Sequence, residues 1–401
     1  MKIELIEKIE GEAFLDVECK KGRITRVYVR FPHYRGIEEI LRGRAPLDAL
    51  VINPRVCGIC GHAHLQATAL VLEKLAGFEP NEKVVKIREI TRFCEMVQNH
   101  VKWFYLVIFD RLGLSYDFRT VHAIIQKINT LSAIFSGQWP HSSYVLPGGI
   151  TCDPSMLDIV QAKRLACQSR ELLEKLLGAF ELKNLSGDLQ RLFAALEAKE
   201  LLYAGKSLDR FITFGDDSYV KAFKILYGKK RPAKLHYVEE FSQPKSHAKG
   251  VLYKGKFYET GPLARTMQRG ESFVKQLHRR YKDSITTRIF ARIYEAHLLL
   301  QKIEEHLQTL DIGMPSYEPV EIGDGEAMVA VEAARGSLVH RVRIKEDKIE
   351  EYSIITPTQW NLANSHDGEP SLIQTALQNA RCKESDIRFR SFDICSVCTT
   401  H

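Results

Sequence analysis

The chain has 401 residues, of which 27% are charged and 45% hydrophobic, as in an ordinary globular protein. No apolar run approaches the roughly 20 residues that a membrane-spanning helix needs, and the charged N-terminus does not resemble a signal peptide. The net charge of +7 suits solubility or an acidic partner. We find no basic run interleaved with aromatic residues, so nucleic-acid binding is not predicted.

Residues 1–31 predict β-strands. The segments 13–18 and 23–31 alternate between apolar and polar residues, and Lys20-Lys21-Gly22 predicts the turn between them. Residues 32–401 predict a mainly α core, a large helical bundle with small peripheral β-sheets. No Pro-rich or Gly/Ser-rich linker and no internal repeat divides the chain, so we expect residues 1–401 to form a single domain.

Four long helices are predicted in the core, together with two regions of short strands. The strands are expected over 248–260 and 327–356. In the last predicted helix, apolar residues recur at three- and four-residue spacing, which indicates packing into a bundle. Such bundles often hold metal sites between facing helices. The predicted helices cover about 60–74, 81–112, 154–182 and 287–310.

Two C-x-x-C pairs lie at opposite ends of the chain, Cys57 with Cys60 and Cys395 with Cys398. Thiolates are soft metal ligands, so the two pairs together offer four of them. A zinc module usually has about 15–20 residues between its pairs, and more than three hundred intervene here. The pattern therefore favours a metal site at the centre of a large fold.

The remaining cysteines show no motif spacing. The total of nine is odd, and a chain of this length can bury a core without disulfides. We therefore expect no disulfide framework and interpret the five as small, buried or partly buried thiols. They are Cys19, Cys94, Cys152, Cys167 and Cys382.

The motifs Arg55-x-Cys57-Gly-x-Cys60-x-x-x-His64 and Asp393-x-Cys395-x-x-Cys398-x-x-His401, in this order, resemble the paired signatures of the NiFe-hydrogenase large subunit. The resemblance runs from the first strand to the last residue. It implies that family's fold and the reversible heterolytic cleavage of H2 into protons and electrons. Further matching segments are 9–11, 34–38, 141–149, 261–265, 332–340 and 356–361.

The resemblance also implies how the metals are held. All four cysteines would bind nickel, and Cys60 and Cys398 would also bridge to iron. The iron would carry carbon monoxide and cyanide ligands. Cys57 and Cys395 would be terminal ligands of nickel.

Proton transfer is implied at two of these positions. The thiolate of Cys395 would take the first proton and pass it to Glu10, which matches the relay glutamate of the family. From the sequence alone, a solvated side chain is the simpler interpretation of Glu10. Glu12 replaces a histidine common in the family, so the resemblance does not extend the route beyond Glu10.

Three polar side chains are expected around the iron ligands. Arg335 would hydrogen-bond to cyanide and polarise bound dihydrogen, although a surface salt bridge is the alternative. Thr358 would donate to the other cyanide, or it caps the helix start at Trp360. Asp393 is expected to pair with Arg335 or with a nearby backbone donor.

Two histidines complete the motifs. His64 would lie one helical turn after Cys60 and tune its sulfur, or it is a satisfied core histidine. By resemblance, a magnesium ion is held by Glu38, by His401 and by a backbone carbonyl, for which we name Ile354.

The chain departs from the family pattern at Asn99, Ala334 and Ile394, where aspartate, proline and proline are common. We expect these changes to remove one negative charge near the site, to alter the local rigidity before Arg335 and to loosen the backbone before Cys395. The end at His401 resembles a product from which a C-terminal peptide has been removed.

Electrons must leave through another chain, because the remaining cysteines lack the spacing of iron–sulfur clusters. The resemblance implies a small subunit that carries such clusters, with further electron-transfer subunits possible. A cytoplasmic location is predicted, unless the partner directs export. One alternative is a scaffold relative without metal chemistry, similar to the quinone-site subunit of respiratory complex I, and another is a zinc-stabilised binding protein.

Overall fold

The N-terminal strands form one antiparallel sheet. The computed structural model describes residues 2–7, 11–226 and 228–395. The sheet has the order β1 (Lys2–Glu7), β2 (Gly11–Lys20), β3 (Arg23–Arg30). The chain turns between β2 and β3 at Lys21 and Gly22, both with positive φ (49° and 74°), so the predicted strands and turn are confirmed.

The four predicted helices are present. They are α3 (Gly61–Leu75), α4 (Glu82–Lys102), α7 (Met156–Leu177) and α11 (Ile285–Thr309). The segment predicted over 81–112 continues after α4 as the π-helix η3 (Trp103–Phe109) and α5 (Asp110–Leu112). The longer helices that were not predicted are α6 (Phe118–Ser136), α8 (Gly187–Ala198), α9 (Pro262–Arg269) and α10 (Ser272–Tyr281).

Polar residues fix where the long helices begin. The side chain of Asn81 accepts a hydrogen bond from Val84 N at the start of α4, and Ser284 does the same for Thr287 N at the start of α11. Such caps satisfy backbone N–H groups that have no partner inside the helix.

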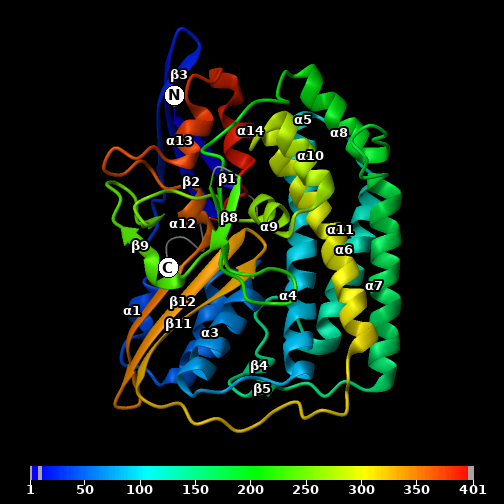
Figure 1. The fold of residues 1–401 in the computed structure, drawn as a ribbon, viewed down its shortest axis with the longest axis vertical. Coiled ribbons are helices and arrows are strands. Elements are labelled where there is room, and N and C mark those ends of the chain that lie inside the picture. The colour runs from blue at the N-terminus through cyan, green and yellow to red at the C-terminus, as the bar shows by residue number, and fades with distance from the viewer. Residues whose placement is uncertain (1, 8–10, 227, 396–401) are drawn as a thin grey trace.

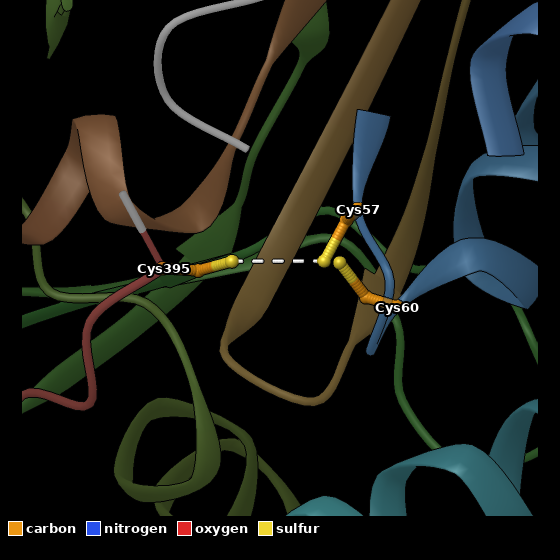
Figure 2. Close-up of side chains that lie close together, drawn as sticks. All are labelled: Cys57, Cys60 and Cys395. Carbon is orange, nitrogen blue, oxygen red and sulfur yellow. Dashed lines mark hydrogen bonds between the residues drawn. The ribbon is translucent and has the colours of Figure 1, made fainter. Parts of the chain in front are cut away.

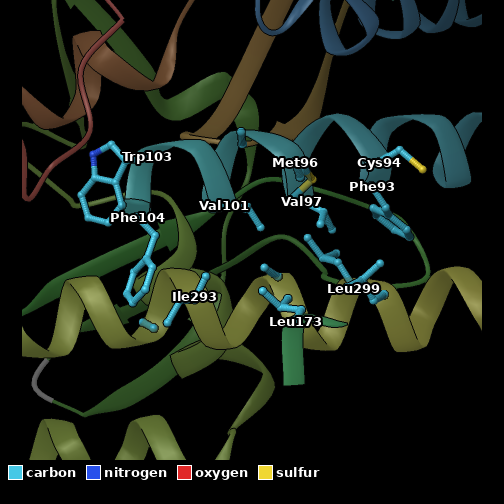
Figure 3. Packing of buried hydrophobic residues seen from close by; sticks show 14 of the residues in the cluster. Phe93, Cys94, Met96, Val97, Val101, Trp103, Phe104, Leu173, Ile293 and Leu299 are labelled. Atoms are coloured by element: carbon cyan, nitrogen blue, oxygen red, sulfur yellow. The ribbon is translucent and has the colours of Figure 1, made fainter. Parts of the chain in front are cut away.

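Helices α4, α6, α7 and α11 stand side by side as a bundle (Figure 1). Their facing sides supply much of the largest buried cluster, in which Val97 and Val101 of α4 pack toward Ile293 and Leu299 of α11 (Figure 3). Burying one such side chain contributes about 1.5–3 kcal/mol, so the interface makes α4 a firm support for the side chains on its other face.

A second sheet, β11 (Gly325–Ala333), β12 (Gly336–Lys345) and β13 (Lys348–Ile355), packs against α3. Its strands are longer than the short ones predicted here. The β11–β12 turn can approach residues 260–261 because both sides carry glycine. A Cβ on Gly336 (φ 138°) would lie 2.5 Å from Thr260 Cγ2, and one on Gly261 (φ 115°) would lie 2.7 Å from the carbonyl oxygen of Arg335.

Short elements complete the described part of the chain. The short strands are β4 (Val145–Leu146), β5 (Gly149–Ile150), β6 (Arg210–Thr213), β7 (Phe223–Leu226), β8 (Lys229–Pro232), β9 (Val238–Phe241) and β10 (Gly250–Tyr253). The short helices are α1 (Ile37–Leu41), α2 (Ala49–Ile52), α12 (Pro357–Asn361), α13 (Leu372–Leu377) and α14 (Ser385–Arg390), with the 3-10 turns η1 (Pro46–Asp48), η2 (Asn53–Val56), η4 (Leu235–Tyr237) and η5 (Cys382–Glu384).

A disulfide joins Cys19 to Cys382, so the interpretation of these two residues as free thiols is wrong. Their Cα atoms lie 6.4 Å apart although 363 positions separate them in sequence. The contact arises because the 379–382 loop pairs with the start of β3, where Ile24 N donates to Ala380 O. Cys94 is buried and Cys152 and Cys167 are partly buried, as predicted.

Positive charge is concentrated in residues 221–256, which hold ten lysines and arginines against two glutamates, whereas the whole chain has an excess of seven. Strands β7 and β8 place Lys224 directly opposite Arg231, and the ammonium of Lys224 lies 5.0 Å from the ring centre of Tyr253. Burial and nearby cations lower the pKa of Lys224. The statement that no basic run is interleaved with aromatic residues is therefore wrong for this segment.

Across residues 2–7, 11–226 and 228–395, no helix combines the length and the apolar character that crossing a membrane requires.

Candidate metal centre

Three cysteine sulfurs from the two ends of the chain meet in the interior. The Sγ atoms of Cys57, Cys60 and Cys395 all lie within 4.8 Å of one another, and those of Cys57 and Cys395 are 3.6 Å apart. Figure 2 shows the three side chains pointing toward a common point. All three residues are buried. The structure thus brings together the cysteines that the two motifs singled out, while Cys398 lies outside the described residues.

The first cysteine pair occupies a tight loop between η2 and α3. Cys57 is extended, and Ile59 N donates to its sulfur at 3.5 Å. Cys60 is the N-cap residue of α3, and His64 N donates to its carbonyl oxygen at 3.3 Å. His64 therefore lies one helical turn after Cys60, as predicted.

A small cavity opens beside these sulfurs. Its walls come from the start of α3, the β11–β12 turn, the start of α12 and the segment at residue 395, so elements far apart in sequence surround one space. The lining residues are Cys60, His64, Ala333, Arg335, Leu338, Thr356, Pro357, Thr358 and Cys395.

Two arginines share one carboxylate at the edge of this centre. Arg335 Nε lies 3.3 Å from Asp393 Oδ1, and Arg292 of α11 contacts Asp393 Oδ2. All three are buried, and Asp393 adopts a left-handed backbone (φ 55°) just before Cys395. Burial lowers the pKa of Arg292, Asp393 opposes this, and Arg335 adds to it. The pairing of Asp393 with Arg335 was expected, whereas Arg292 was not.

Arg265 holds the β11–β12 turn, a role that we did not predict. Its guanidinium donates to both carboxylate oxygens of Glu295 (2.8 and 2.6 Å) and to Glu332 Oε2 (3.0 Å). It also donates to the carbonyl oxygens of Ala333 (3.0 Å) and Ala334 (3.1 Å), immediately before Arg335. The sequence contained one indication of these contacts, since segments 261–265 and 332–340 both match the family. No local pattern indicated that the two segments contact each other.

The charges of this network depend on burial. Burial alone would raise the pKa of Glu295, but Arg265 and His100 outweigh it and hold this pKa at about 2. Burial lowers the pKa of His100 to about 4, although Glu295 contacts its Nε2 at 2.9 Å. Glu295 is therefore a permanent anion between a permanent cation and a neutral imidazole at neutral pH.

Thr358 and His64 both face the cavity. The hydroxyl oxygen of Thr358 accepts from Cys395 N at 3.1 Å. The N-cap of α12 is Thr356, so the alternative that Thr358 caps this helix is wrong. Nδ1 of His64 lies 3.1 Å from Nε2 of His340, a buried pair consistent with the core-histidine interpretation.

Glu38 and Ile354 are in contact, as the predicted magnesium site requires, but Ile354 makes this contact with its backbone N–H and not with the carbonyl named in the prediction. Glu38 Oε1 accepts from the N–H of Ile354 at 2.8 Å, and Lys249 Nζ lies 3.5 Å from Oε2. The ammonium of Lys249 therefore lies beside the carboxylate on which the predicted ion depends. His401, like Glu10, lies outside the described residues, and the magnesium site stays a prediction.

The structure also shows the surroundings of Asn99, Ala334 and Ile394, the three residues expected to depart from the family pattern. The amide nitrogen of Asn99 donates to Ile59 O and to Glu95 O, both at 2.7 Å, which an aspartate cannot do. Ala334 and Ile394 are buried. Carbonyls of Ala333 and Ala334 are held by Arg265, so the backbone before Arg335 is fixed by contacts in place of a proline.

The fold and the three converging sulfurs define a thiolate metal site of the kind that suits nickel and iron, since both accept soft sulfur donors. The sequence matches the nickel-dependent hydrogenase family over residues 35–110 and 218–401, more than half of the chain. The chain belongs to this family. It is a hydrogenase large subunit and hence the catalytic chain of an oxidoreductase. The names of its relatives agree with this assignment.

The periplasmic [NiFeSe] hydrogenase large subunit of Desulfomicrobium baculatum is 26% identical, with 94% of this chain and 88% of that protein covered. Sulfhydrogenase 1 subunit alpha of Pyrococcus furiosus is 25% identical, with 100% and 97% covered. A crystal structure of the Dm. baculatum [NiFeSe]-hydrogenase superposes with a TM-score of 0.87 at 23% identity, covering 100% of this chain and 99% of that one. These likenesses support the large-subunit fold that the motifs implied.

Proposed function

We propose that Cys57, Cys60, Cys395 and Cys398 hold one nickel–iron centre at which H2 is cleaved heterolytically and reversibly. The observation that carries this proposal is the approach of three buried sulfurs within 4.8 Å, from cysteines more than three hundred residues apart. A bridging thiolate can hold two metals close together, and the second cysteine of each pair, Cys60 and Cys398, is assigned that role.

When bound, the centre supplies the Lewis acidity that polarises dihydrogen, a molecule with no group for a side chain to grip. The chain supplies the base. Cys395 Sγ accepts one proton, since a metal-bound thiolate is deprotonated at neutral pH. Glu10 takes that proton onward, an assignment supported by its place in the family motif alone.

Arg335 is assigned to the space above the centre. Arg335 lines the cavity together with Cys60 and Cys395, and its Nε lies 3.3 Å from Asp393 Oδ1. A buried, permanently charged donor suits anionic ligands of iron, so Arg335 would hydrogen-bond to one cyanide and polarise dihydrogen, and the hydroxyl of Thr358 would donate to the other cyanide.

The two electrons leave through a partner. We propose a small subunit with iron–sulfur clusters, because the cysteines outside the two motifs have no cluster spacing and two of them form a disulfide. Related proteins are named as large or alpha subunits, and one is named as an iron–sulfur subunit of an F420-non-reducing hydrogenase. The cytoplasmic location stays a prediction, since one relative is periplasmic.

Metal analysis and infrared spectroscopy of the purified complex test the proposal. We expect nickel together with an excess of iron, because the clusters of the small subunit add iron to that of the centre, and we expect stretching bands of cyanide and carbon monoxide. The Cys395→Ser variant should lose nickel, because an alcohol is a poor ligand for a soft metal, and the bands of the iron ligands should shift. The matched control is Cys152→Ser, a partly buried thiol outside the centre, which should keep both.

The alternatives give different results. Zinc alone in the wild-type complex would identify a zinc-stabilised binding protein. A complex without nickel, without zinc and without the cyanide and carbon monoxide bands would identify a scaffold relative. Normal nickel in Cys395→Ser would show that this cysteine is not a ligand of the centre.

A further inference from the structure

Helix α3 begins at a residue whose side chain is needed elsewhere. Its N-cap residue is Cys60, and no side-chain hydrogen bond from this residue caps the helix. In most helices the N-cap side chain accepts from the N–H of the second or third helical residue. Here the sulfur points toward Cys57 and Cys395 (Figure 2), so the first turn of α3 needs another acceptor.

Glu95 of the neighbouring helix α4 supplies that acceptor. Its Oε2 accepts from His62 N at 2.8 Å and its Oε1 accepts from Ala63 N at 3.1 Å. These are the second and third residues of α3, the two that an N-cap side chain usually serves. Glu95 is completely buried, and its Oε2 also accepts from the indole of Trp139 at 3.3 Å.

The same face of α4 holds the other side of Cys60. Asn99, one helical turn after Glu95, donates from its amide nitrogen to Ile59 O at 2.7 Å. The residues before and after Cys60 are thus both fastened to α4, which the bundle supports from behind. The position of the Cys60 sulfur therefore depends on contacts with α4 as well as on the cysteine loop itself.

Two opposing effects act on the charge of the Glu95 carboxyl group at the start of α3. The positive end of the α3 dipole favours a negative group there. Burial nevertheless raises the pKa of Glu95 to about 7, against the opposing effect of its N–H donors and of Arg335.

We propose that Glu95 is a positioning residue that caps α3 from α4, so that Cys60 is not required as the cap and its Sγ is correctly placed to bind metal. The inference rests on the proposed nickel–iron centre for the role of the sulfur. The cap itself is a separate property that can be measured without reference to the metal.

The test compares two variants with a matched control in the purified hydrogenase complex. Glu95→Ala removes both acceptors, and Glu95→Gln keeps one oxygen but turns an NH2 group toward the other N–H. The control is Glu89→Gln, also buried on α4, whose carboxylate serves Ser218 and His306 instead.

Three readouts are expected to change together. Amide hydrogen exchange at His62 and Ala63 should accelerate about fivefold in Glu95→Ala, the ratio that corresponds to loss of a typical cap. Nickel content per complex should fall, and the infrared bands of the remaining centre should shift. Glu95→Gln should show the same changes to a smaller extent, whereas Glu89→Gln should leave all three as in the wild type.

Two results would overturn the proposal. Faster exchange with unchanged nickel and unchanged bands would mean that the cap is only structural. Nickel loss without faster exchange at His62 and Ala63 would mean that Glu95 does not act through α3. If the wild-type complex holds no nickel, the proposed function fails instead, and exchange at the two amides still reports whether the cap exists.

Discussion

Asn99 illustrates how a single atom adapts the site at the residue scale. Its amide nitrogen contacts two carbonyl oxygens, those of Ile59 and Glu95. The resemblance implies an aspartate at this position, and a carboxylate has no donor. With Glu95 one turn away, a carboxylate already stands near the cysteine loop, and the amide completes the hydrogen bonding that the loop requires.

Asn99→Asp is therefore expected to destabilise the protein. The new carboxylate would face two carbonyl oxygens in a buried place, and an unsatisfied buried acceptor costs about 1–3 kcal/mol. Chemical denaturation of the variant and the wild type measures the difference in the free energy of unfolding. Equal midpoints would show that the amide donor contributes nothing.

At the scale of elements, α11 connects the bundle to the metal centre. One of its faces packs in the core, while Glu295 and Arg292 reach toward Arg265 and Asp393. These contacts tie the β11–β12 turn and the segment before Cys395 to the same helix. The helix was predictable from its apolar spacing, but the partners of its charges were not.

Glu295 should make the protein sensitive to acid. Its pKa is about 2 in the folded protein against an ordinary value of 4.5, so its contribution is complete above pH 4.5 and is lost as the pH falls toward 2. The full difference is on the order of 3 kcal/mol. We expect Glu295→Gln to flatten the decrease in unfolding free energy between pH 4.5 and 2.

Denaturation curves across that pH range provide the measurement. The control is Glu79→Gln, which removes an exposed carboxylate, and its unfolding free energy should change with pH as in the wild type. An unchanged acid slope in Glu295→Gln would contradict the assignment.

At the scale of the whole molecule, both ends of the described chain pack together. Residues of β2 and β3 share a buried cluster with Phe389, Phe392 and Ile394, next to the segment that carries Cys395. The Cys19–Cys382 disulfide closes this arrangement covalently. The N-terminal sheet therefore helps to hold the second half of the metal centre in place.

Removing this disulfide is expected to lower stability by about 2–4 kcal/mol, because the crosslink restricts the unfolded chain over a very long loop. Thermal unfolding of Cys382→Ser with and without reductant measures the effect. Reductant should lower the midpoint of the wild type and of the control Cys167→Ser but leave Cys382→Ser unchanged. A wild type insensitive to reductant would argue against the disulfide.

The sequence by itself determined the class of the protein, the long helices and the cysteines of the centre. Motif spacing and helical periodicity are local properties that a linear pattern records. The tertiary structure alone decided the Cys19–Cys382 crosslink, the Arg265 and Arg292 contacts and the cap from Glu95. Each joins residues that are distant in sequence or on different elements, and their distances depend on how the helices and sheets pack.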